Sequence, residues 1–413
     1  MGRLRQRAAA GAALGLFAFA IVSVSVHGVR AQANAATRAL EYLEGQQSAT
    51  DGSLAGGFSV NELYVLGAAA GGYDPHLLKH GGPSVVDYLT ANARAACPAA
   101  TDTAPSAGLC GYLIQAALAS EADPRAFGGL DIVARLNTYY DPATGKYGDA
   151  QAFTQALAIL GLVAAGEPVP HAALTFVHSV EDSNGGWDYQ DVRDDSANPY
   201  DTSDTNSTSL VLMALDAAGD HSRDSAGLAW LHTAQNPDGG FSYSGGPPSD
   251  PDSTAEVAQA IIATGGSPTA PAWTVGGHTP SAELAATQDA SGGYIGFSGV
   301  PDAFTTTEVV PALDGVAFPI PPASQLYVPG TPLPGSPAPT PQATPTAGVN
   351  ASVITPDAAS GAPPVPSTGG ALTGAGSRSS AGAGGFPRAL TYLLLALGAA
   401  VIAAGAGLVI ARR

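Results

Sequence analysis

A two-helix unit that recurs about every 50 residues dominates this chain and limits what it can fold into. Its clearest copy runs over 227–262, where an apolar segment is stopped at Asn236-Pro237-Asp238-Gly239-Gly240 and a second segment begins near Ser253. Proline cannot continue a helix and glycine accepts left-handed backbone angles, so the sequence predicts a turn between two helices. The second segment is small and apolar on nearly every side over 257–263, which indicates a helix buried all round.

The same order of signals returns along the chain. Two glycines followed by an aromatic residue occur at 185–187, 239–241 and 292–294. A Ser/Thr-x-x-Glu sequence, which predicts a capping box at a helix start, occurs at 253–256 and 305–308. The expected starts of the second helices are Ser59, Ser106, Asp149, Asp204, Ser253 and Thr305. Six helical hairpins are therefore expected over 34–319, and the second, around 85–119, is the most degenerate.

The pattern Gln-x-x-x-Gly-Gly-aromatic is complete at 235–241 and 288–294, and Glu181 takes the Gln position in a third copy. This pattern resembles the prenyltransferase/squalene oxidase repeat of the squalene cyclase and protein prenyltransferase superfamily. The resemblance implies an all-α fold, an α/α toroid with six inner helices around a central cavity and six outer helices. That fold hosts terpene cyclases, protein prenyltransferases, carbohydrate-active enzymes and vitamin carriers, so it does not by itself give a function.

Both ends of the chain carry targeting signals. Residues 1–33 combine three arginines, an apolar run and a small-x-small sequence at 31–33, which is typical of a secretory signal peptide, with an uncleaved anchor as the alternative. Residues 320–388 are rich in Pro, Ala, Thr, Ser and Gly and are predicted to form a disordered spacer. Residues 389–411 are apolar and long enough for a transmembrane helix, and the basic pair 412–413 is expected to stay in the cytoplasm.

The toroid is therefore expected outside the cytoplasm, anchored to the cell membrane. The stretch 365–369, VPSTG, is similar to the LPxTG signal of Gram-positive bacteria, which leaves sortase-type wall attachment as an alternative. Export favours a disulfide between Cys97 and Cys110, although two unpaired cysteines remain the alternative. Two cysteines at this spacing do not make a metal site unaided, and no metal ligand set is recognised.

Acidic residues are concentrated in the predicted toroid. Of the 34 acidic residues, all but Asp357 lie within 34–319, together with only half of the 16 basic residues. This distribution excludes nucleic acid as a partner, because phosphate binding needs clustered Lys and Arg, and it is explained by solubility or an acidic habitat. The acidic loop 188–195 could bind Ca²⁺ through carboxylate oxygens, but it is more typical of a solvated turn, and no other cofactor is expected.

Ligand contacts are expected at the rim where the inner helices begin. The candidate ligand-binding residues are Glu62, Asp149, Gln155, Asp204, Glu256 and Glu308, with Ser59, Asp201, Ser253 and Thr305 beside them at the rim. Each glutamate could instead serve only to cap its own helix.

One stretch bears on catalysis. Class II terpene cyclases carry DxDD followed by Thr, and the middle Asp protonates an alkene; residues 201–205 resemble this motif with Ser203 in the position of the acid. A serine hydroxyl cannot protonate an alkene, so cyclase activity is disfavoured. Aromatic residues that would stabilise carbocations are scarce. The zinc site of protein prenyltransferases is not expected either, because no Asp-x-Cys occurs.

These observations favour an exported, membrane-anchored surface protein whose toroid binds or displays a small molecule or glycan without catalysis. One alternative is an extracellular carbohydrate-active enzyme that uses two of Asp201, Asp204 and Glu256 as acid and base, and another is a divergent terpene cyclase-like enzyme. Convergence of the rim carboxylates would favour an enzyme, whereas carboxylates confined to their own helix caps would not. The sequence predicts neither the ligand nor the oligomeric state.

Overall fold

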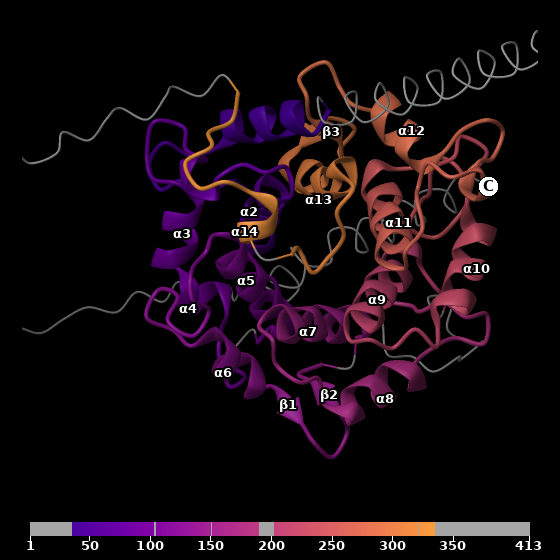
Figure 1. Cartoon of the computed structure of the whole chain (residues 1–413), viewed down its shortest axis with the longest axis horizontal. Coiled ribbons are helices and arrows are strands. Elements are labelled where there is room, and N and C mark those ends of the chain that lie inside the picture. Colours follow the sequence, from indigo (N-terminus) through magenta and orange to yellow (C-terminus); the bar gives the residue numbers. More distant parts are fainter. Residues whose placement is uncertain (1–34, 103–104, 150, 190–201, 322, 335–413) are drawn as a thin grey trace, which may run out of the picture.

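Six parallel inner helices form a closed ring in the computed structural model, which describes residues 35–102, 105–149, 151–189, 202–321 and 323–334 (Figure 1). The ring consists of α2 (Phe58–Ala70), α5 (Ala107–Ala119), α7 (Ala152–Ala164), α9 (Thr205–Ala217), α11 (Pro251–Ala263) and α13 (Ala303–Asp314). Each helix packs against the next in this order, and α13 returns to α2. The predicted all-α toroid is therefore confirmed.

The outer helices precede their inner partners in the chain and cover the ring from outside. They are a helix over 35–46, α3 (Val85–Ala91) with α4 (Ala93–Ala96), α6 (Ile132–Asn137), α8 (His171–Ser179), α10 (Asp224–Ala234) and α12 (Pro280–Ala286). The first outer helix also contacts the last repeat, because Gln288 Nε2 donates to the Ala35 carbonyl at 2.8 Å. This contact brings the two ends of the repeat array together.

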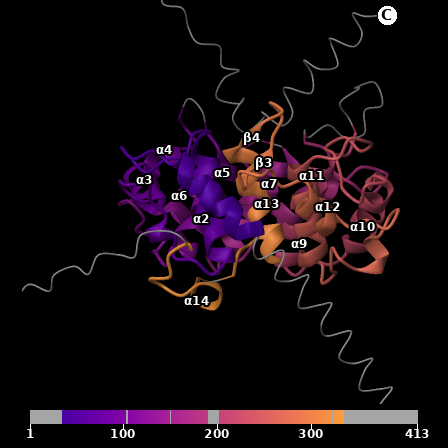
Figure 2. The same ribbon diagram turned by 90° about the horizontal axis from the view of Figure 1, so that it is seen from above.

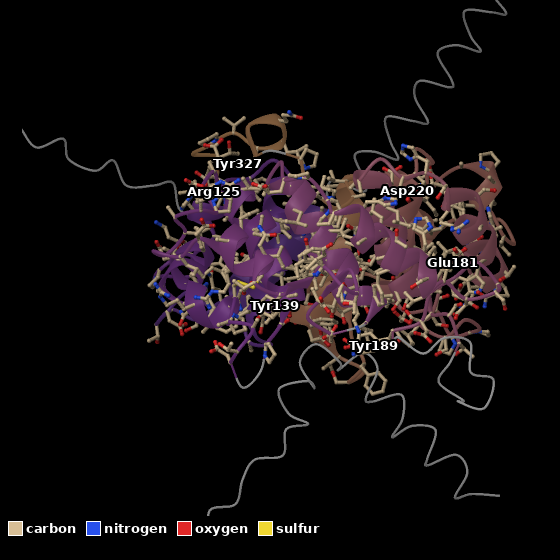
Figure 3. All side chains as sticks on the ribbon, turned by 90° about the horizontal axis from the view of Figure 1, so that it is seen from below. Arg125, Tyr139, Glu181, Tyr189, Asp220 and Tyr327 are labelled. Atoms are coloured by element: carbon tan, nitrogen blue, oxygen red, sulfur yellow. A yellow bond between two sulfur atoms is a disulfide. The ribbon has the colours of Figure 1, made fainter. Side chains whose placement is uncertain are left out.

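Short elements fill the connections. They are η1 (Pro75–Leu77), η2 (Pro271–Trp273), the antiparallel pairs β1 (Tyr140–Asp141) with β2 (Lys146–Tyr147) and β3 (Tyr294–Ile295) with β4 (Pro301–Asp302), and α14 (Ala323–Leu326). Figure 2 shows the ring from the side, with α14 on one face and the β3–β4 pair on the other. The inner helices begin on the face marked by Tyr139 and Tyr189 in Figure 3 and end on the face marked by Asp220 and Tyr327.

Glycine allows two inner helices to approach closely. A Cβ atom on Gly111 of α5 would lie 2.1 Å from the carbonyl oxygen of Leu157 on α7, and one on Gly161 would lie 2.7 Å from the Cα of Gly111. No larger residue fits at either position without moving backbone. The ring is therefore at its tightest between α5 and α7.

The predicted capping boxes at 253–256 and 305–308 are wrong. The N-caps of α11 and α13 are Asp250 and Asp302, whose Oδ1 atoms accept hydrogen bonds from the backbone N–H groups three residues later at 2.7 and 2.8 Å. An aspartate is as good an N-cap as serine, and Pro251 fits the first turn because its missing N–H is not needed there. Both helices therefore begin earlier than expected, which moves Glu256 and Glu308 into the second turn.

One side chain on each inner helix holds the turn that precedes it. In α11, Thr254 Oγ1 accepts a hydrogen bond from Phe241 N at 2.9 Å and contacts the Phe241 carbonyl at 3.3 Å. The equivalent pairs are Asn61 with Leu54, Gln155 with Tyr147, Thr208 with Trp187 and Thr306 with Tyr294. We call these helix side chains latch residues. Each of them lies four positions after the N-cap of its helix.

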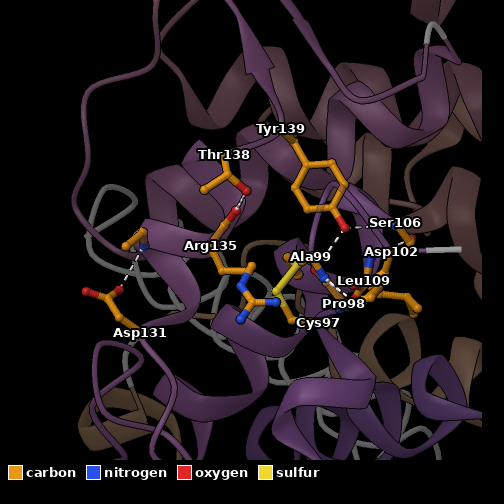
Figure 4. The surroundings of a disulfide bond; sticks show 12 residues. Cys97, Pro98, Ala99, Asp102, Ser106, Leu109, Asp131, Arg135, Thr138 and Tyr139 are labelled. Carbon is orange, nitrogen blue, oxygen red and sulfur yellow. Dashed lines mark hydrogen bonds between the residues drawn. A yellow bond between two sulfur atoms is a disulfide. The ribbon is translucent and has the colours of Figure 1, made fainter. Parts of the chain in front are cut away.

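The latch position of α5 is Cys110, which forms a disulfide with Cys97 (Figure 4). Tyr139 supports the same loop, because its hydroxyl donates to the Pro98 carbonyl at 2.9 Å and accepts from Ser106 N at 3.0 Å. A covalent bond thus replaces the hydrogen-bonded latch in the repeat whose sequence is most degenerate.

The packed part of the chain extends beyond the expected boundary at 319. Tyr327 and Leu333 are buried, and Gly330 N donates to Asp74 Oδ2 at 2.7 Å. The spacer was expected from residue 320, but apolar side chains from the first part of that segment dock on the toroid. The rest of the predicted spacer, the signal peptide, the sortase-like stretch and the segment 389–411 lie outside the described residues. Within the described ranges, no helix combines the length and apolar character needed to cross a membrane.

Candidate functional site

The described core buries acidic side chains without burying a basic one. Its buried charged residues are Glu62, Asp74, Asp188, Asp204, Glu256 and Glu308. Three of them, Glu62, Glu256 and Glu308, belong to α2, α11 and α13, and their exposed fractions are 0%, 3% and 5%. Burial of a carboxyl group away from a cation is unfavourable, so these positions require a specific explanation.

The three glutamates act electrostatically on the phenol of Tyr112, which belongs to α5, the next helix after α11, α13 and α2 in the ring. Burial raises the pKa of Tyr112 well above its usual value, and the negative charges of Glu308, Glu256 and Glu62 raise it further, in that order. Asp252, one turn before Glu256 on α11, also acts on this phenol. We call Glu62, Tyr112, Asp252, Glu256 and Glu308 together the acidic interior.

Glu256 and Glu308 interact directly through their side chains, because α11 and α13 are neighbours in the ring. Burial raises the pKa of both carboxyl groups, and the charge of Asp252 raises them further. Two carboxyl groups can share a hydrogen bond only when one of them carries a proton. The pair therefore holds a proton at neutral pH.

Several buried polar atoms of the inner helices have no hydrogen-bond partner within the described part of the chain. They include both carboxyl oxygens of Glu62, the Oε2 atoms of Glu256 and Glu308, the hydroxyl of Tyr112 and the Oε1 atoms of Gln115 and Gln259. Leaving one such group unsatisfied costs about 1–3 kcal/mol. Unsatisfied and perturbed groups of this kind cluster at functional sites more often than in structural cores.

Asp204 lies at the rim and interacts with the acidic interior. It is the N-cap of α9, where its Oδ1 accepts from Ser207 N at 2.6 Å, and burial raises its pKa to about 7. Its charge raises the pKa of Glu256 and that of the Tyr243 phenol. Of the sequence-predicted carboxylates, the structure thus brings together Glu62, Asp204, Glu256 and Glu308.

The half-buried Asp252 connects this cluster to the rim. Asn206 Nδ2 donates to Asp252 Oδ2 at 3.1 Å, and burial together with the charge of Asp250 raises the pKa of Asp252. Because Asp252 and Glu256 are four residues apart, their side chains lie on one face of α11. A row of acidic groups therefore runs from the rim into the ring.

Other predicted residues have structural roles or lie elsewhere. The amide of Gln155 is fully used, since its Nε2 donates to the carbonyls of Tyr147 and Asp149 and its Oε1 accepts from Tyr147 N. Asp149 is exposed at the start of α7. The backbone N–H groups of Ser253 and Thr305 bind their helix caps. Ser59 is buried in the first turn of α2.

Two predicted features fall wholly or mainly on residues outside the described ranges. Asp201 is one of them, and the predicted Ca²⁺ loop is described only for Asp188 and Tyr189. Elsewhere, His221 Nδ1 lies 2.9 Å from Asp216 Oδ1 and 3.4 Å from Asp224 Oδ2 at the turn between α9 and α10. Asp216 lies in the last turn of the inner helix α9, and both carboxylates already have the imidazole as a partner.

Ser203, the residue in the acid position of the DxDD-like stretch, lies at the glycine turn before α9. Its hydroxyl donates to Asp182 and Asn184, and its Cβ covers Gly186, where an added Cβ would lie 2.6 Å away. The side chain is thus directed toward the outer hairpin. A carboxyl group at 203 would meet the existing carboxylate of Asp182.

Tyr112 was not predicted as a site residue, although the repeat contains a signal for it. Glu256 and Glu308 lie two positions after the latch residues Thr254 and Thr306, and Tyr112 lies two positions after Cys110. The same position in three repeats therefore supplies the centre of the cluster. The degenerate second repeat concealed this register.

The chain itself covers the opposite end of the ring. Phe318, in the segment that follows α13, places its ring edge-to-face against Tyr112, with centroids 6.0 Å apart. Near it lies a pocket of about 490 Å³, lined by Val163, Ile262, Phe318 and Leu326 among others. The acidic interior is therefore closed by apolar residues where the inner helices end.

Comparison with known proteins supports the fold. No protein-family model and no curated protein sequence matches the chain. Among solved structures, the chain is similar to the apo form of the type II terpene cyclase MstE from Scytonema, with 15% identity and a TM-score of 0.50 over 69% of this chain and 98% of that chain. It is also similar to a protein from Actinoplanes, with 15% identity and a TM-score of 0.45 over 69% of this chain and 99% of that chain.

A third similar structure is ent-copalyl diphosphate synthase from Streptomyces platensis, with 16% identity and a TM-score of 0.42 over 62% of this chain and 50% of that chain. At such identities a structural likeness shows the fold alone. The chain thus has a terpene cyclase-like α/α toroid, and its function has to be argued from its own residues.

Proposed function

We propose that this protein is an exported, membrane-anchored surface protein whose toroid binds a small ligand in the acidic interior without catalysing its conversion. The observation that carries the proposal is the set of buried, unpartnered polar atoms of Glu62, Tyr112, Gln115 and Gln259, together with the Glu256–Glu308 pair. Residues that lower stability and serve no structural contact are retained at sites that bind something.

The carbohydrate-active alternative is less well supported. Asp204 and Glu256 do interact, as paired carboxyl groups for glycosidic cleavage would. However, cleavage needs one carboxylate that stays ionised beside the acid, and burial raises the pKa of both groups, that of Asp204 to about 7. At neutral pH the cluster offers protonated groups in excess and lacks a dependable base.

A divergent cyclase-like enzyme is the second candidate, and one observation favours it. The Glu256–Glu308 pair holds a protonated carboxyl group inside a terpene cyclase-like toroid, and protonation of an alkene requires such a group. In this case the acid would come from α11 and α13 instead of the start of α9. Against it, the described aromatic side chains at the cluster are few: Tyr112 and Phe318 contact each other, and Tyr243 lies beside Asp204, which gives little π surface for a carbocation.

The test is a ligand and turnover screen with the purified full-length protein. Glycans, prenyl lipids and small polar molecules are added, and thermal stability and products are measured for the wild type, Glu256→Gln and Glu308→Gln. Glu41→Gln serves as the matched control, because Glu41 is exposed on the first outer helix. We expect a ligand that stabilises the wild type and the control, is recovered unchanged and no longer stabilises Glu256→Gln.

A new product that disappears in Glu256→Gln would instead establish the cyclase-like enzyme. Stabilisation that is equal in all four proteins would place the ligand elsewhere and refute the acidic interior as the site.

A further inference from the structure

We propose that the acidic interior binds an organic amine as its ammonium ion, an inference that rests on the proposed binding function. The geometry behind it is the burial of Glu62, Glu256 and Glu308, each with an unpartnered carboxyl oxygen, on the three consecutive ring helices α2, α13 and α11, in a part of the ring where the described residues bury no cation.

The hydrogen-bonding groups of the site call for a donor-rich ligand. Glu62 has two unpartnered carboxyl oxygens, and Gln115 and Gln259 each present one unpartnered Oε1 acceptor. The Tyr112 hydroxyl accepts as well as donates. An ammonium group has three N–H donors and no acceptor, so it complements this set, whereas a carboxylate or phosphate would add negative charge beside buried carboxyl groups.

Aromatic and apolar groups provide the remaining wall. The rings of Tyr112 and Phe318 meet edge-to-face, and the face of an aromatic ring attracts a cation and also covers an alkyl chain. Phe318 is 2% exposed, so this side of the site is shielded from water. The attraction between opposite charges is strongest where water is excluded. The site therefore favours a cation that also has an apolar part.

A single metal ion fits this arrangement less well than an amine. Among the described residues, the acidic interior does not form a group of three ligands close enough together to hold one ion; the group that does so is Asp216 with His221 and Asp224, at the turn between α9 and α10. Glu62 belongs to α2, whereas Glu256 and Glu308 belong to α11 and α13. A short diamine can offer one ammonium group to Glu62 and the other to the Glu256–Glu308 pair.

The row of acids on α11 supplies an entry route. Asp252 is half-buried at the rim, and Glu256 lies one turn further into the ring on the same helix face. A cation that moves from the surface to the interior can therefore stay in contact with a carboxyl group along the way. The opposite end is covered by the segment that carries Phe318.

Binding of an ammonium ion requires an ionised carboxylate, so the protonated Glu256–Glu308 pair must release a proton when the ligand enters. Affinity is therefore expected to rise with pH, by up to about tenfold per pH unit for each proton released. An uncharged ligand of the same length produces no such dependence. This linkage separates the ammonium site from general binding in the toroid.

The test is titration calorimetry of the full-length protein with diaminobutane and, as the isosteric uncharged control, butanediol. Measurements at pH 6, 7 and 8, each in two buffers of different ionisation enthalpy, give both affinity and protons released. We expect diaminobutane to bind with proton release and increasing affinity, and butanediol to show no saturable binding. Glu308→Gln and Tyr112→Phe should each weaken binding at least tenfold, while Glu41→Gln should bind as the wild type does.

Equal diaminobutane affinity in the wild type and Glu308→Gln would overturn the proposal, because the diamine would then bind to the acidic surface. Absence of binding at all three pH values would overturn it as well. If another compound from the ligand screen still stabilises the protein in a Glu256-dependent way, the amine proposal fails while the proposed binding function stands. If Glu308→Gln does not fold, Tyr112→Phe, which removes one hydroxyl, decides the result.

Discussion

Replacement of Glu62 by Met tests whether the acidic interior is kept at the expense of stability. Glu62 is 0% exposed, and neither of its carboxyl oxygens has a partner in the described structure. Removing a buried unsatisfied polar group relieves about 1–3 kcal/mol, and Met fills a similar volume. We therefore expect Glu62→Met to raise the free energy of unfolding by about 2 kcal/mol, or the melting temperature by about 4 °C.

The gain should also depend on pH in a defined direction. Burial raises the pKa of Glu62 well above its usual value, so the folded state keeps a proton that the unfolded state releases. The wild type therefore loses stability as pH rises above about 4.5, by up to about 1.4 kcal/mol per pH unit, until the folded-state pKa is reached. Glu62→Met lacks this loss, so its advantage over the wild type should be larger at pH 7 than at pH 5.

Denaturant unfolding of the full-length protein at both pH values measures this effect, with the exposed Glu41→Gln as a control that should change stability by less than about 0.5 kcal/mol. If Glu62 were ionised and paired with a buried cation, its removal would instead destabilise the fold by about 3–5 kcal/mol. Such a loss, or a gain that is the same at pH 5 and pH 7, would refute the reasoning.

Three further predictions concern the latch, the closed end of the ring and the DxDD-like stretch. Replacing both Cys97 and Cys110 by Ala should lower the free energy of unfolding, measured with denaturant, by about 3 kcal/mol. A second variant with Ala at 97 and Thr at 110 should recover about 1 kcal/mol, because Thr is the latch residue of three other repeats. Equal stability of the two variants would contradict the latch role. Phe318→Ala should lower stability by about 3–5 kcal/mol and weaken diaminobutane binding, and unchanged binding would show that Phe318 is no part of the site wall. Ser203→Asp, which completes the DxDD sequence, should yield no cyclised product from prenyl substrates by mass spectrometry, because residue 203 faces the glycine turn; a product would contradict that placement.

The repeat architecture could be predicted because its signals are local. Glycine turns such as Gly239-Gly240 and apolar second helices recur in the sequence, and closure of six hairpins into a ring follows from the family resemblance. The start of α11 was misplaced because Asp250-Pro251 and the Ser253 sequence both satisfy the rules for a helix start, and the earlier aspartate is the cap. Where the packed chain ends could not be predicted, since Tyr327 and Leu333 are isolated apolar residues in a Pro-rich segment.

The site was predicted only in part, and partly for a reason that does not hold. Glu256 and Glu308 were selected as residues of capping boxes, whereas they lie in the second turn and interact with each other between neighbouring helices. Tyr112 and Asp252 were missed, because the direction of an inner-helix side chain depends on how the helices are rotated about the ring. That rotation is set by packing contacts such as Gly111 against α7, which no local pattern reports.

The central claim is that the acidic interior is a ligand site, and a crystal structure of the full-length protein grown with excess diaminobutane tests it most directly. The account predicts density for the diamine inside the ring, with a nitrogen about 2.7–3.2 Å from a carboxyl oxygen of Glu256 or Glu308 and from the Tyr112 hydroxyl. A ring interior filled by side chains and water at saturating diamine, with the carboxyl groups hydrogen-bonded only to one another, would contradict it.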